Sequence, residues 1–342
     1  MNGFVRFVVF VVLLLGCGGS KGTEVETAHP ATSVTVATTA TPPAPSATAS
    51  AQTQPTDTHP DAQVAAWHPL LYRVAGAKPS YLFGTIHVPD PRIETFPPDL
   101  DKAIDASDEI VNEMPLDSGT QLSMIGALQL PQGKSLTTEL PAALYARLKD
   151  AFSQKGFAMA LPRLDHFKVW AVAAQVALLD HLKDMAGGKP IDIHIHDKAK
   201  DAGKTTSGLE TAAEQLAVFD GLTKDEQARM LEQTLDQRDK DLHDGKDPVA
   251  SLMNLYIAGS ETPLLDELNA GFDLTRPLDK KLLKRLITDR NKRMSDRIAA
   301  LVKAHPTRAY FFAVGAAHLL GDDGVVAQLK KKGMTIERVT AP

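Results

Sequence analysis

Two histidines that lie far apart in the chain share one local sequence context. His87 follows an apolar segment and Gly84, and His318 follows an apolar segment and Gly315. Glycine at the end of a strand permits positive φ and close approach of a second backbone, and open α/β sheets bind their ligands at the carboxyl edge. The repeated Gly-x-x-His unit therefore predicts a polar site that both imidazoles share. The alternative is that each is an ordinary loop or core histidine, which is the usual role of a single histidine after a strand.

Two carboxylates also stand at the ends of predicted strands. Glu113 lies at the end of the segment 108–114, two residues before Pro115, and Glu210 ends the segment 204–210. A carboxylate at the carboxyl edge of a strand can serve as a metal ligand or a general base. The alternative for each is a solvated glutamate at the edge of the sheet.

The segment 190–197 alternates isoleucine with polar residues. In a strand, this alternation places Asp192, His194 and His196 on one face, and three such side chains could hold a metal ion of their own. The second interpretation is an amphipathic strand that leads into a helix at 197–202 and gives only one polar residue to a site. We prefer the second interpretation.

The elements that must position these side chains alternate along the chain. Apolar runs and turn signals predict strands at 67–74, 80–83, 108–114, 190–197, 204–210, 310–314 and 334–339. Helical spacing predicts helices at 93–107, 121–130, 141–156, 167–182, 224–243, 248–259, 263–271, 278–305 and 324–332. This order indicates an α/β or α+β fold, with a central mixed sheet flanked by helices and a helical insertion between the two Gly-x-x-His units.

The N-terminal segment has the composition of a targeting sequence. Arg6 supplies a positive charge, and residues 7–15 form an apolar run that is too short to span a bilayer. Residues 14–17, Leu-Leu-Gly-Cys, resemble the lipobox of bacterial lipoproteins, which implies cleavage before Cys17 and acylation of that cysteine. Gly18 in place of aspartate then suits the outer membrane of a two-membrane cell. The alternative is an ordinary secretory signal with a chance cysteine.

Composition bounds the remainder of the chain. Cys17 is the only cysteine, which excludes disulfides, thiol catalysis and cysteine metal sites in the mature monomer. Residues 18–62 are rich in Thr, Ala, Pro and Ser, so we predict a disordered tether with a reach of roughly 35–40 Å. Residues 63–342 then form one large domain. A net charge of −5 without a basic run argues against nucleic acid as a partner.

Taken in order, these pieces resemble the TraB/GumN family and its animal relatives, the TIKI-type metalloproteases. The resemblance covers residues 72–339, and each of its motifs is weak alone while the ordered set is specific. The motifs are Leu82 to His87, Ile110 to Glu113, Ile191-Asp192, Leu209 to Thr211 with Gln215, Arg290-Asn291, and Ala313 to Gly321. The resemblance implies a shared site and metal-dependent peptide cleavage. The wider clan also includes erythromycin-esterase-like hydrolases and haem-binding lipoproteins.

The resemblance also implies a metal ligand set. His87, His318 and Glu113 would coordinate a divalent cation, with Asp192 as a further candidate ligand. Mn, Co or Zn suits such a set, so the sequence leaves the identity of the metal open. A position left for water would allow a metal-activated water to attack a peptide or ester carbonyl.

The same resemblance assigns the remaining catalytic roles. Glu210, or Glu113 where it is not a ligand, could take the proton from that water. Arg290, with Asn291 beside it, could stabilise the developing oxyanion or hold a substrate carboxylate.

Three functions are consistent with this sequence. The first is a lipid-anchored metal-dependent hydrolase of the cell envelope, a peptidase that faces the periplasm and acts on peptide or protein substrates. The second is a lipoprotein that uses the same groove to bind haem, a metal or an envelope polymer without turnover. The third is a purely structural envelope protein. Only the first two require His87 and His318.

Overall fold

The computed structural model describes residues 67–340 of the 342-residue chain. The predicted signal peptide at 1–17, with Cys17, and the predicted tether at 18–62 lie outside the described residues. None of the helices within 67–340 is both long and apolar enough to cross a membrane.

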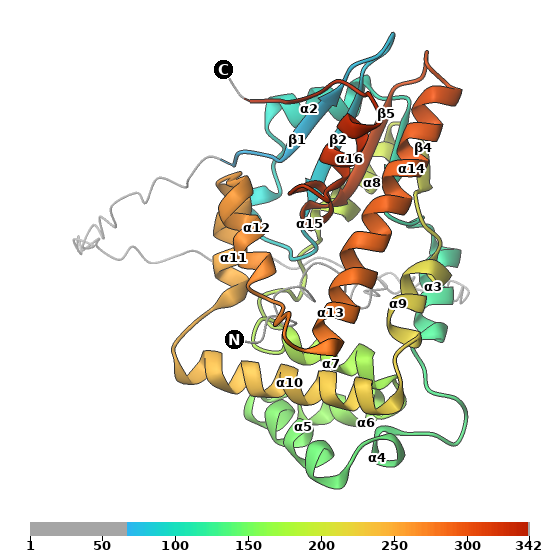
Figure 1. Cartoon of the computed structure of the whole chain (residues 1–342). Helices are drawn as coiled ribbons and strands as arrows, with labels where there is room; N and C mark the ends of the chain where they lie inside the picture. The colour runs from blue at the N-terminus through green and yellow to red at the C-terminus, as the bar shows by residue number, and fades with distance from the viewer. Residues whose placement is uncertain (1–66, 341–342) are drawn as a thin grey trace, which may run out of the picture. The chain divides into compact units, whose positions relative to one another are not determined.

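One mixed sheet of six strands forms the centre of the described chain (Figure 1). Its strands are β1 (Leu71–Val74), β2 (Ser80–Thr85), β3 (Glu109–Asn112), β4 (Thr205–Gly208), β5 (Tyr310–Gly315) and β6 (Ile336–Arg338). The order across the sheet is β4-β3-β5-β2-β1-β6. The first four strands in this order are mutually parallel, and β1 is antiparallel to both of its neighbours. The predicted α/β fold with a central mixed sheet is confirmed.

The central strands are buried because their side chains are apolar on both faces, as in other parallel sheets covered by helices. Every residue of β3 and β5 is buried. Phe83 of β2 packs against Phe311 of β5, with ring centroids 5.9 Å apart. Strand β5, close to the C-terminus, therefore lies in the middle of the sheet between two strands from the N-terminal part.

Helices fill the connections between these strands. Between β2 and β3 lie a short 3₁₀ turn, η2 (Pro91–Ile93), and α2 (Pro98–Ala106). Between β3 and β4 lie α3 (Ser118–Ala127), α4 (Leu136–Glu139), α5 (Ala142–Gln154), η3 (Ala158–Ala160), α6 (Leu161–Leu164), α7 (Val169–Ala177) and α8 (Ile191–Asp201). Between β4 and β5 lie α9 (Ala212–Asp220), α10 (Lys224–His243), α11 (Pro248–Ile257), α12 (Glu261–Asn269), α13 (Pro277–Leu283), the π-helical turn η4 (Lys284–Thr288) and α14 (Asp289–Ala304). After β5 come α15 (Ala316–Leu319) and α16 (Val325–Lys331).

The helical insertion is visible in Figure 1, where α5, α7 and α10 lie together below the sheet. Helix α10 occupies the predicted range 224–243. The helix predicted at 93–107 begins only at Pro98, and the one predicted at 167–182 ends at Ala177. The long helix predicted at 278–305 contains the π-helical turn η4.

The prediction of a strand at 190–197 is wrong, because this segment forms helix α8. Its apolar residues recur at every fourth position, and Ile191, Ile195 and Ala199 are at most 1% exposed. The period-two alternation ends at 197, whereas the four-residue spacing continues through Ala199. In a helix, Asp192 and a residue two positions on point in nearly opposite directions. The three-ligand face of Asp192, His194 and His196 therefore does not exist.

Candidate metal centre

Four neighbouring parallel strands end at one edge of the sheet, and each is followed by a predicted site residue. Strand β4 leads to Glu210, β3 to Glu113, β5 to His318 and β2 to His87. Thr85 and Gly315 are in register at the ends of β2 and β5. Because the carboxyl ends of parallel strands meet at the same edge, these side chains come from adjacent positions along it.

Neither glycine of the two Gly-x-x-His units adopts a left-handed backbone conformation. Neither Gly84 nor Gly315 is among the positive-φ glycines of the described chain, and Gly315 has a φ of −52°. Gly84 allows close approach, since a Cβ atom there would lie 3.1 Å from Ala316 and from Leu70. Gly315 donates its N–H to Glu113 Oε1 at 2.7 Å. The sequence suggested two reasons for a glycine at the end of these strands, positive φ and close approach of a second backbone. Gly84 provides close approach, and neither glycine has a positive φ.

His318 is held by a side chain from helix α14. Asn291 Nδ2 donates to the carbonyl oxygen of Asp323 at 3.0 Å, which leaves Asn291 Oδ1 to accept from Nδ1 of His318 at 2.6 Å. The lone pair of His318 Nε2 then faces Glu113 Oε1 at 3.7 Å. Burial, with the positive charge of Arg290 nearby, lowers the pKa of His318 to about 4. The imidazole is therefore neutral at neutral pH.

His87 is held in a similar way from helix α8. Its Nδ1 lies 3.0 Å from Oδ1 of Asp192, in the first turn of that helix, and both side chains are about nine-tenths buried. Burial alone would lower the pKa of His87, but the Asp192 carboxylate, with Glu113 further away, raises it above the usual value.

Glu113 is the centre of the cluster. Besides the Gly315 N–H and the facing His318, its Oε2 accepts from the Arg290 guanidinium at 2.6 Å and from Gln215 Nε2 at 3.3 Å. Burial opposes ionisation of this carboxyl, but Arg290 and the two imidazoles outweigh burial and lower its pKa to about 2. Glu113 is therefore an anion held among donors.

Glu210 lies under Arg290, and its side chain is completely buried. Oε2 of Glu210 accepts from Nε and Nη2 of Arg290 at 2.9 and 2.7 Å. Oε1 accepts from Nε and Nη2 of Arg293, one turn further along α14. The two glutamates raise the pKa of Arg290 against the effect of its burial.

The donor chemistry at this edge fits a divalent cation in part. Among residues 67–340, no group of three His, Cys, Asp or Glu side chains is already spaced to enclose a metal ion. However, the 3.7 Å between His318 Nε2 and Glu113 Oε1 is longer than a hydrogen bond. Two atoms that share a tetrahedral ion at about 2.0–2.2 Å lie roughly 3.3–3.6 Å apart. A lone pair and a carboxylate oxygen repel each other, so a cation between them would stabilise this pair.

The candidate site residues thus come together, and the segment 190–197 gives only one polar residue to the site, as the preferred interpretation predicted. His87, Glu113, Glu210, Arg290, Asn291 and His318 lie at the carboxyl edge, and Asp192 reaches it from α8. His194 and His196 make no hydrogen bond to a site residue within the described part of the chain, and each has one buried ring nitrogen without a hydrogen-bond partner there.

Sequence reasoning missed two residues of the cluster. Arg293 holds Glu210, and the carbonyl of Asp323 orients Asn291. Spacing could have indicated Arg293, since it lies three residues after Arg290 and therefore on the same side of the helix. No pattern of residue types indicates the carbonyl of Asp323, because any residue has one.

The chain is similar in sequence to known proteins. A sequence model of the TraB/PrgY/gumN family matches residues 70–338. Metalloprotease TIKI2 of Danio rerio is 29% identical over 301 residues, which cover 76% of this chain and 58% of that protein. Metalloprotease TIKI1 of Homo sapiens is 27% identical over 315 residues, with 80% and 62% covered. The chain thus spans about three fifths of these relatives. No solved structure matches it.

Proposed function

The chain belongs to the TraB/PrgY/gumN family, and from this premise we propose that it is a metal-dependent hydrolase that cleaves peptide bonds. The names of its relatives, metalloproteases TIKI1 and TIKI2, support a peptide or protein substrate. The residues at the carboxyl edge of the sheet support the metal requirement. We propose a peptide or protein as the substrate.

One observation carries this proposal. His318 Nε2 and Glu113 Oε1 face each other at 3.7 Å with no proton between them, because the proton of His318 is on Nδ1. An imidazole that binds a metal through one ring nitrogen commonly donates the N–H of its other ring nitrogen to an oxygen acceptor. Asn291 is such an acceptor for His318, and Asp192 is one for His87.

The residues of the chain then have distinct tasks. His87, His318 and Glu113 would hold the metal, which when bound would activate a water for attack on a carbonyl. Asn291 keeps the proton of His318 on Nδ1, and Asp192 orients His87. Arg290 keeps Glu113 ionised. Glu210 accepts hydrogen bonds from two arginines through both of its oxygens, which favours a role in holding Arg290 over the predicted role as proton acceptor.

The experiment uses the protein without its predicted signal peptide and lipid. With added Mn, Co or Zn, we expect cleavage of a broad peptide library, and we expect His87→Ala and His318→Ala each to abolish it. His243→Ala is the matched control, because this exposed histidine lies at the end of α10. Equal cleavage by the parent and both site variants would contradict the proposal.

Metal analysis of the same samples separates catalysis from binding. Metal retained by the parent, lost from both site variants and accompanied by no cleavage would support the binding alternative instead. A haem titration of the parent and of the two variants would test that alternative directly.

The proposal includes the location of the protein. We propose that the chain is anchored by a lipid on Cys17, in the outer membrane and facing the periplasm. The lipobox-like residues 14–17 and Gly18 support this.

A further inference from the structure

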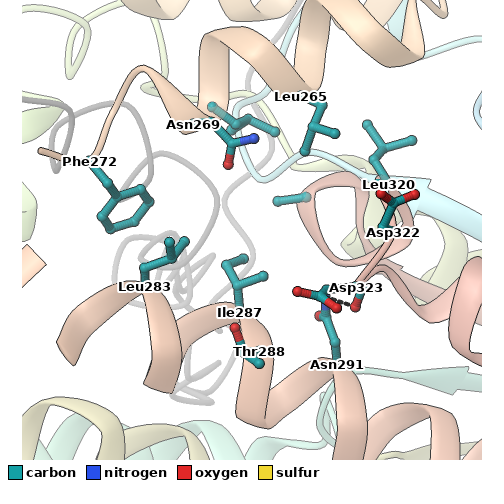
Figure 2. A pocket seen from close by; sticks show the side chains of 13 residues that line it. Leu265, Asn269, Phe272, Leu283, Ile287, Thr288, Asn291, Leu320, Asp322 and Asp323 are labelled. Atoms are coloured by element: carbon teal, nitrogen blue, oxygen red, sulfur yellow. Dashed lines mark hydrogen bonds between the residues drawn. The ribbon is translucent and has the colours of Figure 1, made fainter. Parts of the chain in front are cut away.

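An apolar pocket of about 200 Å³ lies beside Asn291 (Figure 2). Its walls come from helix α12, from the turn after it, from the α13–η4 segment and from the loop after α15. Six of the thirteen lining residues carry large apolar side chains, namely Leu265, Leu268, Phe272, Leu283, Ile287 and Leu320. Figure 2 shows Leu265, Phe272, Leu283, Ile287 and Leu320 around one open space.

The pocket is directly connected to the candidate metal centre. Asn291, which lines the pocket, accepts from His318 and donates to the carbonyl of Asp323 in the pocket rim. Ala317, the residue before His318, also lines the pocket. A group bound there would therefore contact the residues that hold one imidazole of the centre.

Two backbone features occur at the walls of this pocket. The π-helical turn η4 carries Ile287 and Thr288. Such turns are rare in proteins, and those that occur are often found at functional sites. Gly321 at the rim has a φ of +78°, and a Cβ atom there would lie 2.9 Å from the Leu265 side chain. Glycine at this position therefore allows the rim and α12 to approach each other without filling the space.

The rim of the pocket is acidic. Asp322 and Asp323 are exposed, and Figure 2 shows both beside the apolar space. Their backbone carbonyls accept hydrogen bonds, but within residues 67–340 their carboxylates form neither a hydrogen bond nor an ion pair. The rim therefore offers free negative charge next to an apolar space.

We propose that this pocket is the subsite for one large apolar side chain of a peptide substrate, with a basic residue of the same peptide at the Asp322–Asp323 rim. The volume fits a single side chain, since an apolar cavity of about 150 Å³ holds a benzene-sized ring. Sites for drug-sized ligands are larger, at about 300–1,000 Å³. This inference rests on the proposed peptidase function and names the class of peptide that it acts on.

The first test measures binding without metal or turnover. The probes are acetyl-Phe-Lys-amide and acetyl-Ala-Lys-amide, titrated calorimetrically into the metal-free protein. Burial of the phenyl ring should make the first probe bind at least about tenfold more tightly. Asn269→Trp, which places a large ring at an exposed residue of the pocket wall, should remove this difference. Asp266→Trp, at an exposed position of the same helix outside the pocket, should preserve it.

Substitutions at the rim test the basic residue. The double change Asp322→Asn and Asp323→Asn should weaken acetyl-Phe-Lys-amide by about threefold and leave acetyl-Phe-Gln-amide unchanged. Equal affinity of the parent for the Phe and Ala probes would overturn the subsite, and so would an unchanged preference in Asn269→Trp.

The second test separates this inference from the proposed function. In the metal-loaded protein, peptides cleaved from a library should share a large apolar residue at one fixed distance from the cleaved bond. Ile287→Ala should enlarge the pocket and shift this preference toward tryptophan. Cleavage without any such preference would overturn the subsite and leave the peptidase function standing. Binding that distinguishes Phe from Ala without any cleavage would support the pocket and contradict the peptidase function.

Discussion

At the residue scale, the candidate centre depends on which ring nitrogen of each histidine is available. Asp192 and Asn291 come from different helices, and each contacts Nδ1 of one imidazole. Their effect is to fix the ring and to leave Nε2 for the centre. Residues of this kind usually contribute strongly to metal affinity although they do not touch the metal.

We therefore expect Asp192→Ala and Asn291→Ala each to weaken metal binding by about 10–100-fold. Affinity can be measured by competition with a chelator of known strength. Asp197→Ala is the matched control, because Asp197 lies on the same helix as Asp192 and its carboxylate contacts Lys189 at 2.7 Å. Unchanged affinity in both site variants would show that the two imidazoles are not metal ligands.

Arg290 provides a prediction about stability. Its side chain is 2% exposed, and its guanidinium contacts both Glu113 and Glu210. Arg290→Met would keep much of the volume but remove the guanidinium that two buried carboxylates share. The expected cost is about 3–5 kcal/mol in the free energy of unfolding, measured by urea titration.

The control for this change is Arg147→Met. Arg147 pairs with Asp236 and Asp239 at the surface, and loss of such pairs costs about 1 kcal/mol or less. A cost for Arg290→Met no larger than that of the control would contradict a structural role for the buried pairs.

Most residues of the candidate metal centre could be predicted from the sequence. The glutamates stand at the ends of predicted strands and the histidines shortly after such strands, so their position follows once the strands are parallel. Arg293 was not predicted, because an arginine on a helix is normally solvated, although its spacing from Arg290 places both on the side of the helix that contacts Glu210.

At the element scale, the spacing between β2 and α15 depends on a glycine. The Cβ atom of an alanine at position 84 would lie 3.1 Å from Ala316, the first residue of the helix that carries His318. We expect Gly84→Ala to cost about 1–3 kcal/mol of stability, as overpacking does elsewhere, and to weaken metal binding. Thermal unfolding and the chelator competition measure the two effects.

Gly126→Ala serves as the comparison for this change. Gly126 is exposed on α3, and a Cβ atom there would meet nothing within 4 Å. This variant should be stabilised by about 0.5–1 kcal/mol. Equal effects of the two substitutions would refute the packing argument at Gly84.

The contact between α9 and α14 predicts a pH dependence of stability. Hydrogen bonds from Arg297 lower the pKa of Glu214 from 4.5 to about 2. A lower pKa in the folded state stabilises that state above about pH 4.5, and this stabilisation is lost as the pH falls toward 2. The side chain of Glu214 is 31% exposed. Solvent screening therefore leaves a contribution on the order of 1 kcal/mol.

Glu214→Gln should accordingly be less stable than the parent at pH 6, and the two should converge as the pH approaches 2. Urea titrations at several pH values measure this. Glu232→Gln, at an exposed position on α10, should give a curve parallel to that of the parent. The same parallel curve for Glu214→Gln would contradict the assigned pair.

Helix α8 illustrates why one element was assigned wrongly. Over residues 191–195 all three isoleucines fit a strand of period two, whereas only Ile191 and Ile195 fit a helix with contacts at every fourth residue. The choice between them is made by Ala199, which continues the helical stripe, and by Pro190 immediately before the helix. The correct element brings Asp192, alone among the three polar residues, into contact with His87.

At the scale of the whole molecule, the central sheet joins the two ends of the sequence. Strand β5 lies between β3 and β2, so the two Gly-x-x-His units become neighbours only when the last part of the sheet has been added. The sequence predicted the strands and the class of fold. The order of the strands could not be read from it, because pairing over more than two hundred residues leaves no local pattern.

Cys17, the proposed site of lipid attachment, lies outside residues 67–340. If acylation of Cys17 anchors the protein, Cys17→Ser should abolish incorporation of labelled fatty acid and move the protein from the detergent phase to the aqueous phase. Cys17 is the only cysteine, so no other thiol can replace it. Gly18→Asp should leave acylation intact but alter the sorting between the two membranes. Since the candidate centre is built entirely from residues after 67, the Cys17→Ser protein should cleave soluble peptides as the parent does. Labelling that persists in Cys17→Ser would contradict the lipid anchor and leave the metal centre unaffected.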